Sequence, residues 1–66
     1  MDIPKNEILC VWFNDKDDNP RNVITSTKNR ETYKLYKVVD NDLVYTKHKA
    51  KDPRDLERWV FNNEDD

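Results

Sequence analysis

The most apolar stretch of the chain is Glu7–Asn14, EILCVWFN, which lies between the polar residues Asn6 and Asp15. It is short and rich in β-branched and aromatic residues, which favours a strand over a helix. Strict alternation makes both faces of this strand apolar, with Ile8, Cys10 and Trp12 on one and Leu9, Val11 and Phe13 on the other. Two apolar faces are typical of a strand at the centre of a sheet or inside a small barrel.

Three weaker strands follow. Residues 15–20, DKDDNP, form a turn cluster, and residues 22–27, NVITST, predict a second strand antiparallel to the first. Residues 32–39 and 43–49 predict a third and a fourth strand joined through Asp40, Asn41 and Asp42. Because the chain contains no glycine, these three are the residues best able to adopt positive φ in the turn. A loop of two residues and a loop of three give different strand registers, and the pattern leaves both open.

The sequence DPRD at residues 52–55 predicts the start of a helix. Asp52 suits the N-cap, Pro53 the first helical position and Asp55 the first turn. Leu56, Trp59 and Val60 then form an apolar stripe that packs on the sheet. Phe61 falls off the stripe and is expected past the helix end, with Asn62 or Asn63 as a left-handed cap.

These elements predict an α+β fold in the order β-β-β-β-α, a four-stranded antiparallel sheet with one C-terminal helix. A partly closed barrel, similar in layout to the SH3-like barrels that end in a helix, is the alternative form of the same prediction. The 66 residues make a single domain, with 1–6 and 62–66 expected to be frayed. A core this small makes a homodimer one expected partner.

Composition narrows the class of protein. Charged residues make up 39% of the chain at a net charge of only −2, and the apolar residues are clustered, which favours a folded domain. One unpaired cysteine suits a reducing compartment, and the longest apolar run, Ile8 to Phe13, is too short for a membrane span. We therefore expect a cytoplasmic location and no membrane partner. The Asn-, Lys- and Asp-rich composition suggests a bacterial or phage origin.

The residues that bear chemistry form no catalytic or metal site. Asp15, Asp17 and Asn19 have the spacing with which a calcium loop begins, but Pro20 stands where that loop needs glycine. Cys10 and His48 lack the third group and the oxyanion donors that a nucleophilic pair requires. We expect no enzyme activity, no cofactor and no metal.

Charge is segregated along the chain. Residues 1–20 carry two basic and five acidic side chains, a net charge of −3. Residues 21–51 carry eight basic and three acidic side chains, a net charge of +5, and residues 52–66 carry two basic and six acidic side chains, a net charge of −4. A basic, tyrosine-rich hairpin is thus enclosed by acidic ends.

Two functions fit this hairpin. The first is a non-enzymatic protein-binding module, a small inhibitor or regulator of the phage or mobile-element type, because rigid tyrosines with polar tips suit interfaces. Its predicted contact residues are Tyr33, Lys34, Tyr36, Lys37, Tyr45 and Lys47, with Arg54 and Arg58 at the rim. The alternative is nucleic-acid binding, for which the slightly acidic chain is unusual. That function would use Lys28, Arg30, Lys34, Lys37, Lys47 and Lys49.

Overall fold

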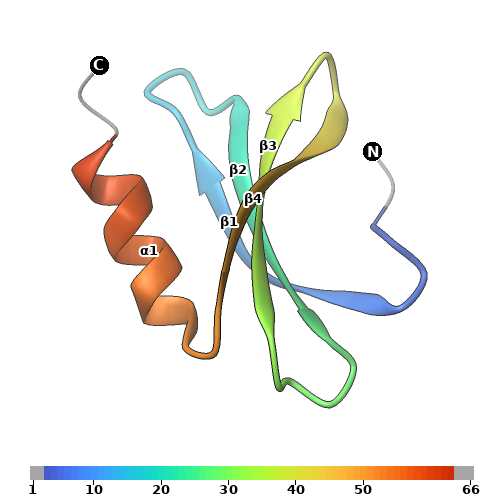
Figure 1. The fold of residues 1–66 in the computed structure, drawn as a ribbon. Coiled ribbons are helices and arrows are strands. Elements are labelled where there is room, and N and C mark those ends of the chain that lie inside the picture. The colour runs from blue at the N-terminus through green and yellow to red at the C-terminus, as the bar shows by residue number, and fades with distance from the viewer. Residues whose placement is uncertain (1–2, 64–66) are drawn as a thin grey trace.

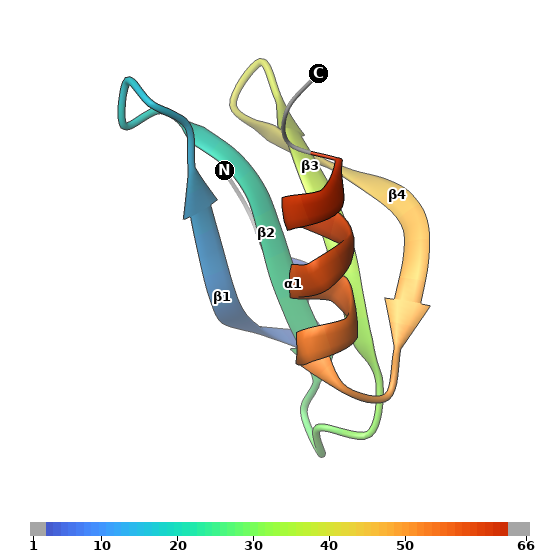
Figure 2. The same ribbon diagram turned by 90° about the vertical axis from the view of Figure 1, so that its left-hand side faces the viewer.

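A computed structural model of the protein describes residues 3–63. Its elements are β1 (Glu7–Asn14), β2 (Pro20–Thr27), β3 (Tyr33–Val39), β4 (Asp42–Ala50) and α1 (Pro53–Asn62). The strands form one antiparallel sheet in the order β1-β2-β3-β4, and α1 lies across one face of it (Figure 1). The predicted β-β-β-β-α fold is confirmed. The sheet is open, with β1 and β4 at opposite edges, so the barrel alternative is wrong (Figure 2).

The core lies between the sheet and the helix. Ile24 and Leu35, from the two central strands, are fully buried and contact Leu56 and Val60 of α1. Four partly buried side chains complete the cluster: Val11, Phe13, Tyr33 and Ala50. Because β-strand side chains alternate, the neighbours of these residues point to the opposite face, which α1 leaves uncovered.

Local turn and cap signals account for the connections. Asp40 and Asn41 have φ of 50° and 68°, so the β3–β4 loop has two residues and the register pairs Tyr36 with Tyr45. The Asp52 side chain accepts a hydrogen bond of 2.9 Å from the backbone N–H of Arg54, as predicted for an N-cap. The sequence left the register of the β3–β4 hairpin open. The structure shows that a turn of two residues able to adopt positive φ determines it.

The prediction for the end of the helix was wrong. Phe61 lies inside α1, where its ring makes an edge-on contact with Phe13 at a centroid distance of 6.1 Å. Asn63 ends the helix at φ −110°, outside the left-handed region, and its side-chain amide donates to the carbonyl of Trp59 at 2.7 Å. The contact with Phe13 gives the last turn an apolar partner that the stripe of α1 alone does not reveal. The expected acidic tail, residues 64–66, lies outside the described residues.

The central position predicted for β1 was also wrong, because β1 is an edge strand. A bulge between Leu9 and Val11 adds Cys10 to the strand and breaks its alternation. Val11 and Phe13 consequently pack beneath α1, while Leu9 and Trp12 share the uncovered face. The two apolar faces of β1 thus serve the core and an exposed surface, rather than two layers of core.

Candidate functional site

The uncovered face of the sheet carries a continuous row of apolar and aromatic side chains, one from each strand. Trp12 pairs with Val23, Val23 with Tyr36, and Tyr36 with Tyr45, so the four lie side by side across the sheet. We call these four residues the aromatic row. Val23 is 0% and Tyr36 8% exposed, whereas Trp12 and Tyr45 at the two ends are each 39% exposed. The row therefore has a rigid, buried middle and two accessible aromatic ends.

A second row runs next to the first and adds positive charge. Leu9 pairs with Thr25, Thr25 with Lys34, and Lys34 with Lys49. The Lys34 ammonium lies 6.0 Å from the ring centroid of Tyr45, at the outer limit of a cation–π contact. The Tyr36 and Tyr45 rings lie 5.4 Å apart, a tilted aromatic pair. Charge and aromatic surface are thus adjacent on this face.

Glu7 joins the two rows through a hydrogen-bond network. Its carboxylate accepts from the Thr25 hydroxyl at 2.5 Å and from the Tyr36 hydroxyl at 2.9 Å. The Lys34 ammonium donates to the other carboxylate oxygen at 3.4 Å, and the Glu7 side chain is only 10% exposed. The network connects β1, β2 and β3 and holds the Tyr36 ring in place.

The network sets the protonation of its members. Burial raises the pKa of Glu7, but the hydrogen bonds from Thr25 and Tyr36 and the charge of Lys34 outweigh it and lower that pKa below its ordinary value. Burial and the hydrogen bond to Glu7 raise the pKa of Tyr36 to about 12. Around neutral pH, Glu7 is therefore ionised and Tyr36 is a protonated donor, which suits a fixed scaffold better than proton transfer.

The structure separates the eight residues predicted to contact a partner. Lys34, Tyr36 and Tyr45 lie together on the uncovered face. Tyr33 packs against the core on the helix side, and Lys37, four positions on, shares that side. Lys47 lies in an irregularity of β4 with φ of 69°. The last two, Arg54 and Arg58, are exposed on α1, which covers the sheet face opposite the aromatic row.

The residues predicted for nucleic-acid binding are also dispersed. Lys34 and Lys49 are directly opposite each other on the uncovered face. Lys28 and Arg30 lie in the turn between β2 and β3, at one end of the sheet. With Lys37 on the helix side, the basic residues form no single stripe.

Sequence reasoning missed Val23 of the aromatic row and the residues that β1 contributes to this face, Glu7, Leu9 and Trp12. Glu7 contacts side chains 18 and 29 residues away, and no local motif indicates such a contact. Leu9 and Trp12 were assigned to opposite faces because the alternation pattern contains no sign of the bulge at Cys10. The one sequence feature that pointed to Leu9 and Trp12 as surface residues was their large apolar side chains in an otherwise polar chain.

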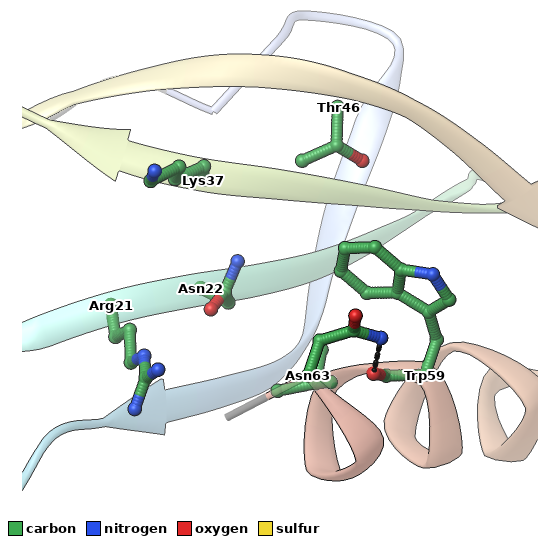
Figure 3. Close-up of a pocket in the computed structure, with 7 residues that line it drawn as sticks. Arg21, Asn22, Lys37, Thr46, Trp59 and Asn63 are labelled. Carbon is green, nitrogen blue, oxygen red and sulfur yellow. Dashed lines mark hydrogen bonds between the residues drawn. The ribbon is translucent and has the colours of Figure 1, made fainter. Parts of the chain in front are cut away.

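A small pocket opens on the other face, beside the C-terminal end of α1 (Figure 3). Its lining residues are Arg21, Asn22, Lys37, Thr46, Trp59, Val60 and Asn63. Its volume of about 160 Å³ is below the range of roughly 300–1,000 Å³ typical of small-molecule sites. Basic side chains near a helix C-terminus also have a structural role, because they complement the helix dipole. The pocket is therefore a weaker candidate than the aromatic row.

Trp59, predicted to be core, is 37% exposed and lies on the ring of His48 at a centroid distance of 4.1 Å. His48 is on β4, whereas Cys10 is on β1, at the other edge of the sheet. Three strand spacings, about 14 Å, separate those edges. The Cys10 thiol contacts the Ser26 hydroxyl at 3.4 Å. The two residues thus form no nucleophilic pair.

The turn that resembles the start of a calcium loop has a structural role. The Asp15 carboxylate accepts hydrogen bonds from the backbone N–H groups of Asp17 at 2.8 Å and Asn19 at 3.0 Å. Those bonds lower the pKa of Asp15 and use the carboxylate to close the turn. Among residues 3–63, no three His, Cys, Asp or Glu side chains are grouped so as to hold a metal ion. Within the same residues, no helix has the length and apolar character required to cross a bilayer.

Comparison with protein families, with curated proteins and with solved structures finds no match to this chain.

Proposed function

We propose that this protein is a non-enzymatic binding module that acts as an inhibitor or regulator by occupying a surface of a partner protein. The contact surface is the aromatic row together with Leu9, Lys34 and Lys49. The observation that carries the proposal is the exposure of Trp12 and Tyr45 on either side of a buried middle. Protein interfaces concentrate their binding energy in such aromatic anchors, surrounded by a polar rim.

The row is preorganised. The Tyr36 hydroxyl is held by Glu7, and the Tyr45 ring packs against Tyr36. Side chains that are already fixed lose little rotamer freedom on binding, so more of the contact energy becomes affinity. The Thr25 hydroxyl completes this support from β2.

The charge of the surface indicates the chemistry of the partner. Lys34 and Lys49 bring two positive charges against the single negative charge of Glu7, which already pairs with Lys34. An apolar partner patch flanked by Asp or Glu complements this arrangement. A nucleic acid is disfavoured because the other basic residues of the central segment lie at the sheet end, at the β4 edge and on the helix side.

Two tryptophans provide a matched test. Trp12 and Trp59 are 39% and 37% exposed but lie on opposite faces of the sheet. We expect Trp12→Ala to weaken partner binding about 30-fold, the effect of losing an anchor worth about 2 kcal/mol. Trp59→Ala should leave the affinity within about threefold of the wild type.

The measurement is capture of partners from a nuclease-treated lysate of the native host, followed by calorimetry with the protein identified. Circular dichroism confirms that each variant is folded. If Trp12→Ala captures the same partner with unchanged affinity, the aromatic row is not the binding surface. If capture disappears after nuclease treatment, the partner is a nucleic acid and the proposal is wrong.

A further inference from the structure

We infer that two copies of this chain associate through β1, pairing edge to edge and antiparallel into one eight-stranded sheet. This inference concerns the strand edge rather than the sheet face. It shares Leu9 and Trp12 with the proposed contact surface, but it is tested on the purified chain alone, so its failure is distinguishable from failure of the proposed function. Among residues 3–63, β1 pairs with β2 alone, so the backbone groups on its other side are open to a partner strand.

The two edges of the sheet differ in how they are protected. β4 carries Lys47 and Lys49, and two extra residues, Thr46 and Lys47, break its pairing with β3. Outward lysines and backbone irregularities are the usual means by which proteins prevent strand addition. β1 is also irregular, between Leu9 and Val11 and between Phe13 and Asn14, but it contains neither lysine nor proline, and Ile8 to Phe13 includes no charged residue. The absence of lysine and of charge makes β1 the less protected of the two edges, and thus the one that accepts another strand.

Exposed apolar side chains lie along both sides of the β1 edge. On the uncovered face, Leu9 is 48% and Trp12 39% exposed. On the helix face, Phe61 is 61% exposed and contacts Phe13 of β1. Exposed apolar side chains on both sides of an unpaired strand are typical of a protein interface. We call these residues, Leu9, Trp12 and Phe61, the apolar margin. A strand added here would cover both sides of the margin at once.

A second copy fits this edge better than an unrelated strand. Two antiparallel copies of one strand are related by a two-fold axis, so each supplies the surface that the other needs. The uncharged segment brings no like charges together, and the one acidic residue of β1, Glu7, is already bonded to Tyr36 and Lys34. A 66-residue chain with a buried apolar cluster this small gains stability from burying more surface.

The bulge fixes where the copies meet. Because Cys10 interrupts the alternation of β1, Leu9 and Trp12 share the uncovered face. Antiparallel pairing of Glu7–Asn14 with the same strand of the second copy sets Leu9 of each copy beside Trp12 of the other, and Glu7 beside Asn14. The exposed side chains of the two copies then cover one another on that face.

Leu9 and Val44 provide a matched pair for the test, because each lies on an edge strand and is 48% exposed. We measure the mass of the purified full chain by analytical ultracentrifugation, from about 1 µM to about 1 mM. The wild type and Val44→Lys should reach twice the mass of one chain. Leu9→Lys should weaken the dimer at least tenfold and remain folded by circular dichroism.

A second readout keeps the test independent of any folding defect. In a Trp59→Phe background, emission from Trp12 should shift to longer wavelength on dilution as the dimer dissociates. A wild type that stays monomeric over the whole range, with unchanged Trp12 emission, overturns the inference. So does a dimer that Val44→Lys weakens as much as Leu9→Lys.

Discussion

Glu7 stabilises the uncovered face through a single carboxylate that bonds three side chains, those of Thr25, Lys34 and Tyr36. Its folded-state pKa is lower than the ordinary value of 4.5, so the ionised form is favoured by the folded state. The stability that Glu7 contributes is therefore fully present above about pH 4.5 and is lost as the pH falls through the lowered pKa. Over the same window, the acceptor that the Thr25 and Tyr36 hydroxyl groups share loses its negative charge.

We predict that Glu7→Gln lowers the free energy of unfolding at neutral pH by about 1–3 kcal/mol, because buried hydroxyls lose a charged acceptor. The variant should also show a weaker loss of stability below pH 4.5 than the wild type does. Urea unfolding at a series of pH values measures both effects. Glu31→Gln, in the exposed β2–β3 turn, is the control and should behave as the wild type. If Glu7→Gln loses as much stability below pH 4.5 as the wild type does, other carboxylates cause that loss.

At the scale of elements, α1 depends on its first turn. The Asp52 side chain bonds the backbone N–H of Arg54 at 2.9 Å and pairs with the Arg54 guanidinium at 3.2 Å. Those contacts lower the pKa of Asp52. Since α1 covers the only core cluster among residues 3–63, loss of the cap should destabilise the whole domain.

We predict that Asp52→Ala costs about 1 kcal/mol of unfolding free energy, the usual effect of removing an N-cap. Asp52→Asn keeps a side-chain oxygen able to accept the same bond and should stay close to the wild type. The midpoint of urea unfolding separates the two variants. Equal destabilisation by both would mean that charge rather than capping accounts for the effect.

The sequence predicted correctly those features of the fold that depend on neighbouring residues alone. The cap at Asp52 and the turn at Asp40 and Asn41 need only neighbouring residues, and both predictions hold. The location of β1 depends on which strands pair, and its apolar pattern fits a centre and an edge equally well. The bulge at Cys10 has no sequence signal, so the face on which Trp12 lies could not be derived.

The residues of the candidate surface divide in the same way, into those on one hairpin and those brought in by distant strand pairing. Lys34, Tyr36 and Tyr45 were predicted as tyrosines and a lysine of one hairpin, and the two-residue turn between β3 and β4 brings them onto one face. The partners Glu7 and Trp12 come from β1, across the sheet, and needed the full register. Composition indicated that aromatic and basic residues form the working surface, and only the tertiary structure determines which of them share a face.

At the scale of the whole molecule, the charge segregation along the chain does not become a basic stripe in space. The segment of residues 21–51 carries +5, but it forms three strands whose side chains point to both faces of the sheet. Lys34 and Lys49 are the neighbouring pair on the uncovered face. A nucleic-acid backbone that follows this face therefore meets two lysines rather than six.

This count predicts the salt dependence of any binding to nucleic acid. Two phosphate contacts give a slope of about −1.4 for log affinity against log salt on single strands, and six contacts give about −4. We expect weak binding to labelled single-stranded DNA with the shallow slope, measured by fluorescence anisotropy at increasing salt. Replacing Lys34 and Lys49 with Gln should abolish it, whereas replacing Lys28 and Arg30 should not. A slope near −4, lost through either pair, would mean that the scattered basic residues act together and would favour nucleic-acid binding over the proposed function.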